Sequence, residues 1–271
     1  MDIKDRKTLL KNTFDTISEG YDNHALRFFS ESAKHLVSYL NLEGDEHVLD
    51  VATGTGIVVL TLAKHLPSGR ITGIDFSEGM LSQARAKQRK SNIHNAEFLK
   101  MDMEAIEYPK NHFDAAVCAF GLFYVEDMQG QLSHISDKVK PGGKILITSF
   151  QEKSFLPLVE MFLDRIQKYG IETPVVPWEH LETEDVCTSL FKTVGLKDVN
   201  CRQKDISYYL RNADEWWDIV WNGGYRRFVN QLSPNDMKRF KDEHLKEVKE
   251  LSSDNGIRLQ VIILYTAGTK P

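Results

Sequence analysis

The stretch that decides the fold is Val48-Leu49-Asp50-Val51-Ala52-Thr53-Gly54-Thr55-Gly56. It predicts an apolar strand that runs into a Gly-x-Gly turn and then directly into a helix over residues 57–66. Glycines at such a turn let the backbone bend tightly and let a ligand approach without meeting a Cβ. The helix N-terminus behind the turn offers free N–H groups and a positive potential to an anionic group. The same pattern also occurs as a plain tight connection, so its function depends on what surrounds it.

Strands and helices alternate around this stretch. Apolar runs predict strands over residues 47–51, 70–75, 96–100, 113–119 and 144–150. Helical spacing predicts helices over residues 57–66, 78–90 and 127–139, the second capped by Ser77 and the third ended by Pro141-Gly142-Gly143. Alternation of this kind predicts an α/β fold with a Rossmann-like, doubly wound and mostly parallel sheet.

The flanks of this core have a different pattern. Residues 1–40 predict an N-terminal helical cap, and residues 41–150 form the core itself. Residues 151–257 predict a helical lid insertion with one core strand over 198–205, and a proline after Ser233 marks a helix start within it. Residues 258–271 predict a last core strand, which we expect to be antiparallel.

Composition excludes several classes of protein. The chain has 271 residues and a net charge of −5, without a run of basic residues interleaved with aromatics, so nucleic acid is a poor candidate partner. No apolar run is long enough to span a membrane. Cys118, Cys187 and Cys201 lie far apart in the sequence, as is usual in a reducing compartment. We therefore expect a soluble, cytoplasmic protein, and leave open whether it forms a homodimer.

Acidic residues follow the next two predicted strands. Asp75 ends the second strand, 25 residues after Asp50, where a carboxylate can accept hydrogen bonds from both ribose hydroxyls of a nucleoside. Asp102 follows the third strand, where it can accept from an adenine amino group while Met103 covers the ring. Asp75 could instead cap the next helix, and Asp102 could be an ordinary loop residue. Suitable groups at three successive strand ends favour a nucleoside-binding site.

A dinucleotide cofactor fits this pattern less well. A dinucleotide fingerprint has a third glycine three residues after the second, and here that position is Val59. A short-chain dehydrogenase also needs a Tyr-x-x-x-Lys pair, and no tyrosine of this chain has a lysine four residues later. A dehydrogenase on the same fold therefore remains only as an alternative.

Together these motifs resemble the class I S-adenosylmethionine (SAM)-dependent methyltransferases, in the branch that includes the ubiquinone/menaquinone-biosynthesis enzymes and small-molecule relatives. The resemblance covers most of the chain, is strongest over residues 47–149 and is looser after residue 150. The motifs are 49–56, Gly73-Ile74-Asp75-Phe76-Ser77 with Met80, Asp102-Met103, Ala119-Phe120-Gly121-Leu122 and Val139-Lys140-Pro141-Gly142-Gly143. The resemblance implies SAM as cofactor, bound by Tyr21, Asp50, Ala52, Thr53, Gly54, Gly56, Asp75, Phe76, Met80, Asp102, Met103, Ala119, Phe120 and Tyr124.

The N-terminal segment also resembles this branch. Phe14-Asp15 and Tyr21-Asp22 match a segment that closes over the cofactor, which implies that Tyr21 lies near the methionine carboxylate. The sulfonium of SAM is a cation that aromatic faces attract, so Tyr21, Phe120 and Tyr124 are candidates for that contact. Each of them could equally be a core aromatic residue.

The resemblance implies an enzyme that transfers a methyl group to a small-molecule acceptor by in-line displacement. Whether oxygen, nitrogen or carbon attacks is left open, and we assign no catalytic base. The nine histidines show no metal-ligand spacing, so no metal site is expected. The lid is rich in aromatic residues that suit a flat or apolar acceptor, although core packing also explains them. A non-catalytic SAM-binding partner protein is a further alternative.

Overall fold

The computed structural model describes residues 3–173 and 177–271, and the chain divides into two compact units. The sheet unit consists of Phe29–Glu152, Pro177–Lys204 and Ile263–Pro271. The helical unit consists of Met1–Phe28, Lys153–Val176 and Asp205–Ile262. Residues 174–176, which belong to the predicted lid insertion, lie outside the described residues.

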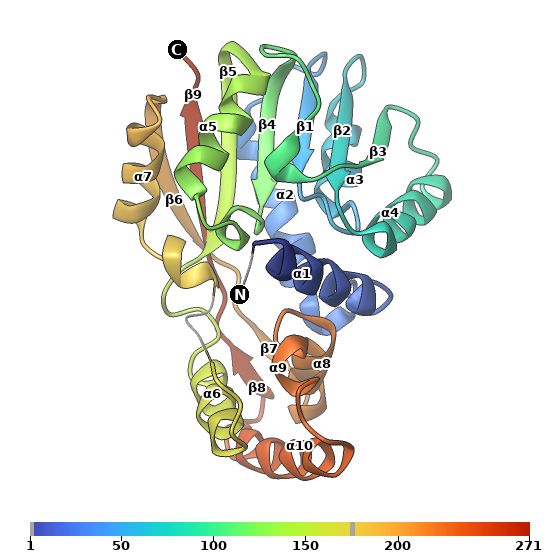
Figure 1. Ribbon diagram of the computed structural model, residues 1–271, viewed down its shortest axis with the longest axis vertical. Coiled ribbons are helices and arrows are strands. Elements are labelled where there is room, and N and C mark those ends of the chain that lie inside the picture. The colour runs from blue at the N-terminus through green and yellow to red at the C-terminus, as the bar shows by residue number, and fades with distance from the viewer. Residues whose placement is uncertain (1–2, 174–176) are drawn as a thin grey trace. The chain divides into compact units, whose positions relative to one another are not determined.

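The sheet unit is built on a seven-stranded sheet of order β3-β2-β1-β4-β5-β9-β6 (Figure 1). The pairs β1–β2, β1–β4, β2–β3 and β4–β5 are parallel, whereas β5 and β9 run antiparallel. This confirms the predicted mostly parallel sheet with an antiparallel last strand. The strands are β1 (His47–Val51), β2 (Arg70–Asp75), β3 (Ala96–Lys100), β4 (Phe113–Ala119), β5 (Val139–Phe150), β6 (Lys197–Asp205) and β9 (Ile262–Thr269).

The central strands are nearly all apolar because helices cover both faces of the sheet. Val48, Leu49 and Val51 are fully buried in β1, and Figure 1 shows one helix in front of the sheet and another behind it. The helix in front is α5 (Met128–Lys138) and the helix behind is α2 (Phe28–Leu40). The other helices of this unit are α3 (Ile57–Leu62), α4 (Glu78–Lys90) and α7 (Glu184–Thr193).

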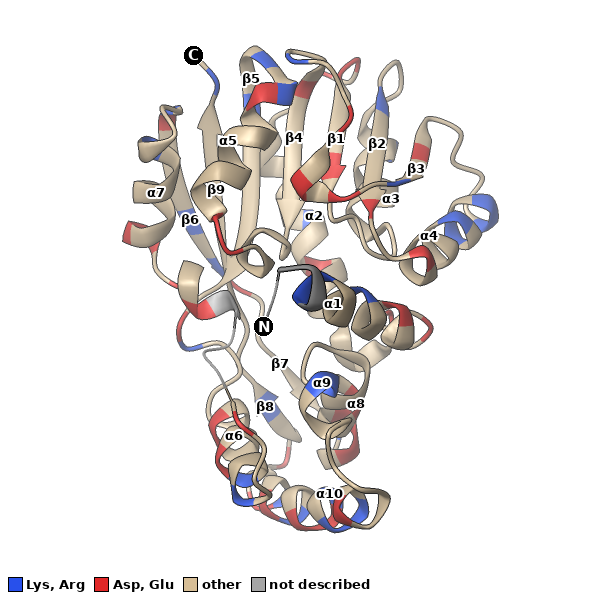
Figure 2. Cartoon of the chain, viewed as in Figure 1, with Lys and Arg blue, Asp and Glu red and all other residues tan. Residues whose placement is uncertain are grey.

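Local sequence signals set the helix boundaries in this unit. Ser77 caps α4 as predicted, because its side chain accepts a hydrogen bond from the Met80 N–H at 3.1 Å. The last turn of α4 carries Lys87, Arg89 and Lys90, and Figure 2 shows these cations grouped at the helix C-terminus, where they complement the helix dipole. Helix 57–66 is shorter than predicted, since α3 ends at Leu62 and a 3-10 turn follows over Ala63–His65.

One predicted strand begins earlier than expected. The register between β4 and β5 jumps from Phe113↔Val139 to Ala115↔Lys144, so residues 140–143 bulge out of the pairing. Gly142 lies in this bulge with φ of +80°, as a turn residue would. The Pro-Gly-Gly sequence therefore bends the chain locally, but Val139 already pairs with Phe113 and places the start of β5 before the bend.

The helical unit contains α1 (Ile3–Ile17), α6 (Leu158–Lys168), α8 (Ala213–Asn222), α9 (Arg226–Val229) and α10 (Pro234–Lys249). A small antiparallel pair, β7 (Tyr208–Leu210) with β8 (Ile257–Leu259), completes it. Ser233 caps α10 as predicted, accepting from the Asp236 N–H at 3.2 Å. None of the helices in the described part of the chain has the length and apolarity needed to cross a membrane.

The predicted strand over residues 258–267 is wrong as a single element. The chain forms β8 and then β9, which belong to different sheets. The break falls at Gln260 and Val261, whose carbonyl groups accept hydrogen bonds from the N–H groups of Phe155 and Ile206 instead of from a neighbouring strand of either sheet. Apolar composition alone could not reveal this change of partner.

The core of the helical unit is aromatic and contains one buried histidine. The rings of Phe162, Phe240 and His244 lie within 5.7 Å of one another, centroid to centroid. Trp216 is fully buried and donates its indole N–H to His244 Nε2 at 2.8 Å. His244 is also fully buried, and its Nδ1 has no hydrogen-bond partner. Burial lowers the pKa of His244 to about 4, and the nearby Arg165 guanidinium adds to this effect.

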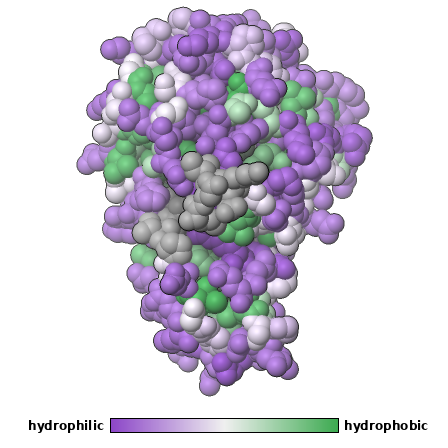
Figure 3. All heavy atoms as spheres, viewed as in Figure 1, coloured by the Kyte–Doolittle hydropathy of each residue, from purple (hydrophilic) through white to green (hydrophobic). Residues whose placement is uncertain are grey.

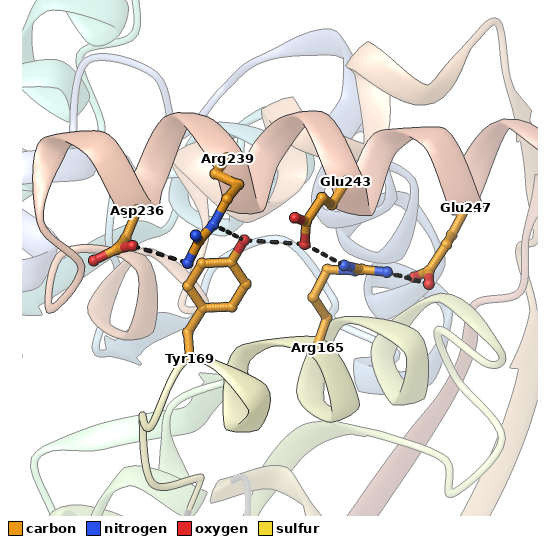
Figure 4. A network of polar contacts seen from close by, with 6 residues as sticks. All are labelled: Arg165, Tyr169, Asp236, Arg239, Glu243 and Glu247. Atoms are coloured by element: carbon orange, nitrogen blue, oxygen red, sulfur yellow. Dashed lines mark hydrogen bonds and ion pairs between the residues drawn. The ribbon is translucent and has the colours of Figure 1, made fainter.

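A polar network joins α6 to α10 at the edge of this core (Figure 4). Arg165 donates to Glu243 at 2.7 Å and, through Nε, to Glu247 at 3.0 Å. Tyr169 donates its hydroxyl to Glu243 at 3.0 Å and accepts from Arg239 at 3.1 Å. The side chain of Arg165 is only 13% exposed, whereas those of Glu243 and Glu247 are 44% and 41% exposed, so the network links the two helices at the boundary between the core and solvent.

Hydrophilic side chains dominate the face drawn in Figure 3, with small hydrophobic groups between them. The large hydrophobic residues that are exposed among those described, Leu9, Val186, Tyr209 and Leu251, belong to different elements.

The buried histidine predicts an acid-sensitive step. An unfolded histidine has a pKa of about 6.5, so between pH 6.5 and 4 the unfolded chain binds a proton that folded His244 does not. The free energy of unfolding should therefore fall as the pH falls through this window, by up to about 1.4 kcal/mol per pH unit from this group. In His244→Gln the amide oxygen can still accept from Trp216, so the variant should fold and show a shallower slope in urea unfolding at pH 4.5 to 6.5.

The matched control is His94→Gln, since His94 is exposed in the loop between α4 and β3. It should keep the wild-type slope. Equal slopes for His244→Gln and the wild type would show that His244 is not the buried neutral group described above.

Candidate functional site

Most of the predicted site residues follow the carboxyl ends of four neighbouring parallel strands, β3, β2, β1 and β4. The structure thus brings together residues that lie up to 74 positions apart, from Asp50 to Tyr124. Open α/β sheets bind ligands at this edge. By strand, the residues are Asp50, Ala52, Thr53, Gly54 and Gly56 at β1, Asp75, Phe76 and Met80 at β2, Asp102 and Met103 at β3, and Ala119, Phe120 and Tyr124 at β4.

The backbone after β1 and β4 is strained. Ala52 has φ of +56° and Phe120 has φ of +54°, a left-handed conformation that costs a residue with a Cβ on the order of 1 kcal/mol. Hydrogen bonds hold both residues in place, because the Thr53 N–H donates to the Ile74 carbonyl at 2.9 Å and the Phe120 N–H donates to the Thr148 carbonyl at 3.1 Å. Strain of this kind at adjacent strand ends is typical of a functional site.

The two glycines of the turn have different surroundings. Gly54 has φ of +55°, and a Cβ added there would meet no atom within 4 Å. Gly56 has φ of +77°, and a Cβ there would lie 2.8 Å from the Phe98 ring and 2.9 Å from the Ala84 Cβ. Gly54 therefore leaves room beside the backbone for a ligand, whereas Gly56 is needed for packing against β3 and α4.

Asp75 links the loops after β1 and β2. Its Oδ2 accepts a hydrogen bond from the Gly54 N–H at 2.8 Å, and its Oδ1 accepts from the Ser77 N–H at 2.8 Å. The side chain is 7% exposed. The bond from the Ser77 N–H is the one expected of an aspartate at the start of a helix. Asp75 therefore has the capping contact that was the alternative prediction.

Asp50 is a buried carboxyl group with one oxygen unused. Its Oδ2 accepts from the Thr53 hydroxyl at 2.6 Å, while its Oδ1 has no hydrogen-bond partner. Burial, helped by the negative charge of Asp75 and opposed by the hydrogen bond from the Thr53 hydroxyl, raises the pKa of Asp50 to about 7. A buried carboxylate is costly unless a cation or a proton compensates it, so Asp50 is suited to a cationic ligand group.

Asp102 and Met103 also have structural contacts. Asp102 is half-buried and caps a 3-10 turn over Met103–Ala105, accepting from the Glu104 N–H at 2.9 Å. The Met103 carbonyl accepts from the side-chain amide of Gln131 at 2.7 Å. These bonds fix the loop after β3, and a role in binding adenine stays a prediction.

The predicted aromatic residues divide between the two units. The Phe120 ring stacks on Phe150 at 4.6 Å and meets Phe29 edge-on at 5.3 Å. Tyr124 ends a 3-10 turn over Leu122–Tyr124 in the same unit. Tyr21 belongs to the helical unit, where its ring lies 6.4 Å from that of Phe14.

One contributor, Gly121, was part of a quoted motif but was not among the predicted cofactor-binding residues. A Cβ at Gly121 would lie 2.9 Å from both the Ala52 Cβ and the Cys118 sulfur, so this glycine lets the loops after β1 and β4 touch. The signal in the sequence was the position of this glycine just after the fourth predicted strand. Among the residues that the structure describes, no three His, Cys, Asp or Glu side chains lie together as a metal site would require.

Comparisons with known proteins show what the core of the chain is similar to. Residues 48–143 match the model of a family described as a methyltransferase domain. Demethylmenaquinone methyltransferase of Bacteroides fragilis is 29% identical over 158 residues, which are 56% of this chain and 64% of that protein. Aklanonic acid methyltransferase DauC of a Streptomyces species is 28% identical over 167 residues, which are 58% of this chain and 76% of that protein.

The solved structures support the fold. A putative methyltransferase from Bacillus halodurans superposes with a TM-score of 0.59 at 17% identity, covering 89% of this chain and 99% of that one. The family match and the relatives support the predicted recognition: residues 48–143 are similar to a methyltransferase domain, and both relatives are named as methyltransferases.

The contrast between the two glycines yields a prediction about SAM binding. Gly54→Ala should fold, because the new Cβ points into open space, yet bind SAM at least about tenfold more weakly, because that space is where the ligand meets the backbone. Gly56→Ala should lower the melting temperature more, because its Cβ collides with Phe98 and Ala84. Thermal unfolding and calorimetric SAM titration measure the two effects separately.

Gly195→Ala is the control for backbone strain alone, since Gly195 has φ of +84°, has nothing within 4 Å of an added Cβ and follows α7, outside the site. It should bind SAM as the wild type does. Normal SAM affinity in a folded Gly54→Ala variant would place the cofactor elsewhere.

Proposed function

We propose that this chain, whose core is a class I SAM-dependent methyltransferase domain, transfers a methyl group from SAM to a small-molecule acceptor. The observation that carries the proposal is the edge formed by the loops after β1 and β2. There a backbone with open space at Gly54 lies beside a buried carboxyl group, Asp50, that has an unused oxygen. The chain spans about two thirds or less of several relatives it matches, among them 64% of the Bacteroides enzyme, so the activity of the whole protein is part of the proposal.

The chemical groups of SAM match the residues at this edge. Its α-ammonium group is a cation that can compensate the buried charge of Asp50, and its ribose diol can donate to the carboxylate of Asp75. Its carboxylate suits the free N–H groups at the start of α3, which follows Gly56 directly. Phe76 and Met103 are half-buried apolar residues at two neighbouring strand ends and suit the adenine ring.

SAM supplies an electrophilic methyl group on a sulfonium centre. The contribution of the chain is to bind and orient this group, to align the acceptor with it and to exclude water. His134 accepts a hydrogen bond from the Ile106 N–H at 3.0 Å through Nε2, which is a structural task. We therefore assign the rate enhancement to proximity and alignment and name no general base.

The acceptor class is inferred from the relatives. The names of two of them specify demethylmenaquinone and aklanonic acid, both small molecules. We infer that the acceptor of this chain is likewise a small organic molecule, and not a protein or a nucleic acid.

The helical unit is the proposed cover of the site. We infer that residues 1–24 and 150–255 close over the cofactor and that Tyr21 then lies near its methionine end. Support comes from the helical unit itself, in which the N-terminal segment and the insertion pack together through α1 and α9 and so can act as one body. Trp216 and Trp217 are buried in this unit and serve its packing.

The function is tested with methyl-labelled SAM and a panel of phenolic, quinol, amine and carboxylic acid acceptors. Label should move to at least one acceptor, with formation of S-adenosylhomocysteine in equal amount. Binding of a nicotinamide cofactor with no response to SAM would instead support a dehydrogenase. SAM binding without transfer to any acceptor, in the presence of a stably bound second protein, would support a non-catalytic partner.

The raised pKa of Asp50 predicts proton release on SAM binding. At pH 7 the carboxyl group of Asp50 is about half protonated, and a cation beside it favours the charged form, so binding should release about half a proton. Calorimetric titrations in phosphate and in Tris should therefore give different apparent enthalpies. Asp50→Asn should bind SAM more weakly and should give the same enthalpy in both buffers.

Asp114→Asn is the matched control, because Asp114 lies near the amino end of β4 and pairs with Lys140. It should retain the buffer dependence. Identical enthalpies in both buffers for the wild type would mean that the ammonium group does not approach Asp50.

The proposed cover predicts a second effect of SAM. Hydrogen exchange should slow around Tyr21 and in part of residues 150–255, in addition to the loops after β1 and β2. Tyr21→Ala should lower turnover by about tenfold or more while changing the melting temperature little, because it would misalign the cofactor.

Tyr209→Ala, which removes an exposed ring from the same unit, is the control and should remain active. Protection confined to residues 47–149, together with a fully active Tyr21→Ala variant, would mean that the helical unit does not cover the site.

A further inference from the structure

Two of the three cysteines lie near each other at the β6 edge of the sheet, which is the edge opposite to β3. Cys187 lies on α7 and Cys201 on the edge strand β6, and neither takes part in the candidate cofactor site. Their thiols interact with each other, although the residues are 14 positions apart in the sequence, and the Cys187 thiol also donates to the Leu181 carbonyl at 3.5 Å. Cys187 is fully buried, whereas Cys201 is partly exposed.

Two hydroxyl groups of the sheet hold this thiol pair in place. The Thr266 hydroxyl donates to the Cys201 sulfur at 3.2 Å, and the Ser149 hydroxyl lies 3.7 Å from the Cys187 sulfur. Ser149 pairs with Leu264 across β5 and β9, so Thr266, two residues further along β9, projects from the same face of the sheet. The two sulfurs therefore sit over one face, each against a different strand of the antiparallel pair.

This arrangement favours a thiolate. The neighbouring Cys201 thiol lowers the pKa of the Cys187 thiol, the Ser149 and Thr266 hydroxyls add to that effect, and burial opposes it. In the same pair the pKa of the Cys201 thiol is raised by its interaction with Cys187 and by burial. A thiolate is the form that attacks peroxides and disulfides.

The third cysteine provides a contrast within the same chain. Cys118 is buried in β4, and its thiol pKa is raised by burial and by the nearby Asp50 carboxylate. It lies at the end of β4, where its sulfur interacts with the backbone of Gly121 and Leu122. Cys118 is therefore expected to stay inert under conditions that oxidise the pair.

We propose that Cys187 and Cys201 are a redox-sensitive dithiol that hydrogen peroxide converts reversibly into a disulfide between α7 and β6. The Cys187 thiolate attacks one peroxide oxygen, the O–O bond breaks, and the hydroxide that leaves takes up a proton to form water. The resulting sulfenic acid is attacked by the Cys201 sulfur, so that the S–S bond forms, the S–O bond breaks and a second water leaves with the Cys201 proton. Two thiols are oxidised and one peroxide is reduced to two water molecules.

The approach to the pair is from the side of Cys201, whose partial exposure admits a molecule as small as peroxide. The disulfide would join the helix that packs Cys187 and Phe191 onto the sheet to the strand at the sheet edge. It closes a short loop, and cross-links of this length stabilise by restricting the unfolded chain. Oxidation should therefore fasten α7 to the sheet without touching the cofactor loops.

The test uses the full wild-type chain, treated with hydrogen peroxide, alkylated and digested with trypsin without reduction. Trypsin can cut after Lys192 and Lys197, which separates the two cysteines, so a disulfide appears as a linked pair of peptides. We expect this linked pair, an alkylated Cys118, and full reversal by dithiothreitol. The oxidised protein should melt roughly 5–10 °C higher than the reduced protein.

Cys201→Ser is the matched variant, since a serine hydroxyl can keep the bond to Thr266. It should fold, give no linked peptides and show no peroxide-induced rise in melting temperature. The proposal is overturned if wild-type Cys187 and Cys201 remain free thiols, if each oxidises separately to a sulfinic acid, or if linked peptides appear only between chains or only in urea.

Discussion

The carboxylate of Asp75 is the contact on which the candidate site depends. It joins the N–H of Gly54, in the loop after β1, to the N–H of Ser77, at the start of α4. These two loops approach from different strands, and a single buried anion with a backbone donor on each oxygen holds them at a fixed separation. Bonds to a charged acceptor are stronger than neutral ones, which helps to hold the loops in their strained conformation.

Two unfavourable features lie at the same edge of the sheet: strained backbone after β1 and β4, and a buried carboxylate oxygen without a hydrogen-bond partner. Ala52 and Phe120 adopt left-handed conformations at adjacent strand ends, and Asp50 beneath them keeps one oxygen without a hydrogen-bond partner. Each feature alone would destabilise the fold, and none contributes to packing. Their coincidence is explained if the edge is shaped for a ligand that carries a cation and a diol, as SAM does.

Much of this edge could be predicted from the sequence, because short apolar strands, glycines and capping residues act locally. The bounds of β1 to β4, the cap at Ser77 and the positions of Asp50 and Asp75 follow from such signals. What could not be predicted depends on contacts distant in sequence. The division of residues 258–267 between two sheets is decided by backbone partners at Phe155 and Ile206, and the packing role of Gly56 by Phe98 and Ala84. The meeting of Cys187 with Cys201 likewise needs the helix and the edge strand to be in place, since their spacing matches no known motif.

The most direct test of the central claim is a crystal structure of the chain with S-adenosylhomocysteine bound. The account predicts the ribose hydroxyls within hydrogen-bond distance of Asp75, the ammonium group against Asp50 Oδ1, and the ligand lying along the open side of Gly54. A ligand bound away from the loops after β1 and β2, or bound there with Asp50 Oδ1 still without a partner, would contradict it.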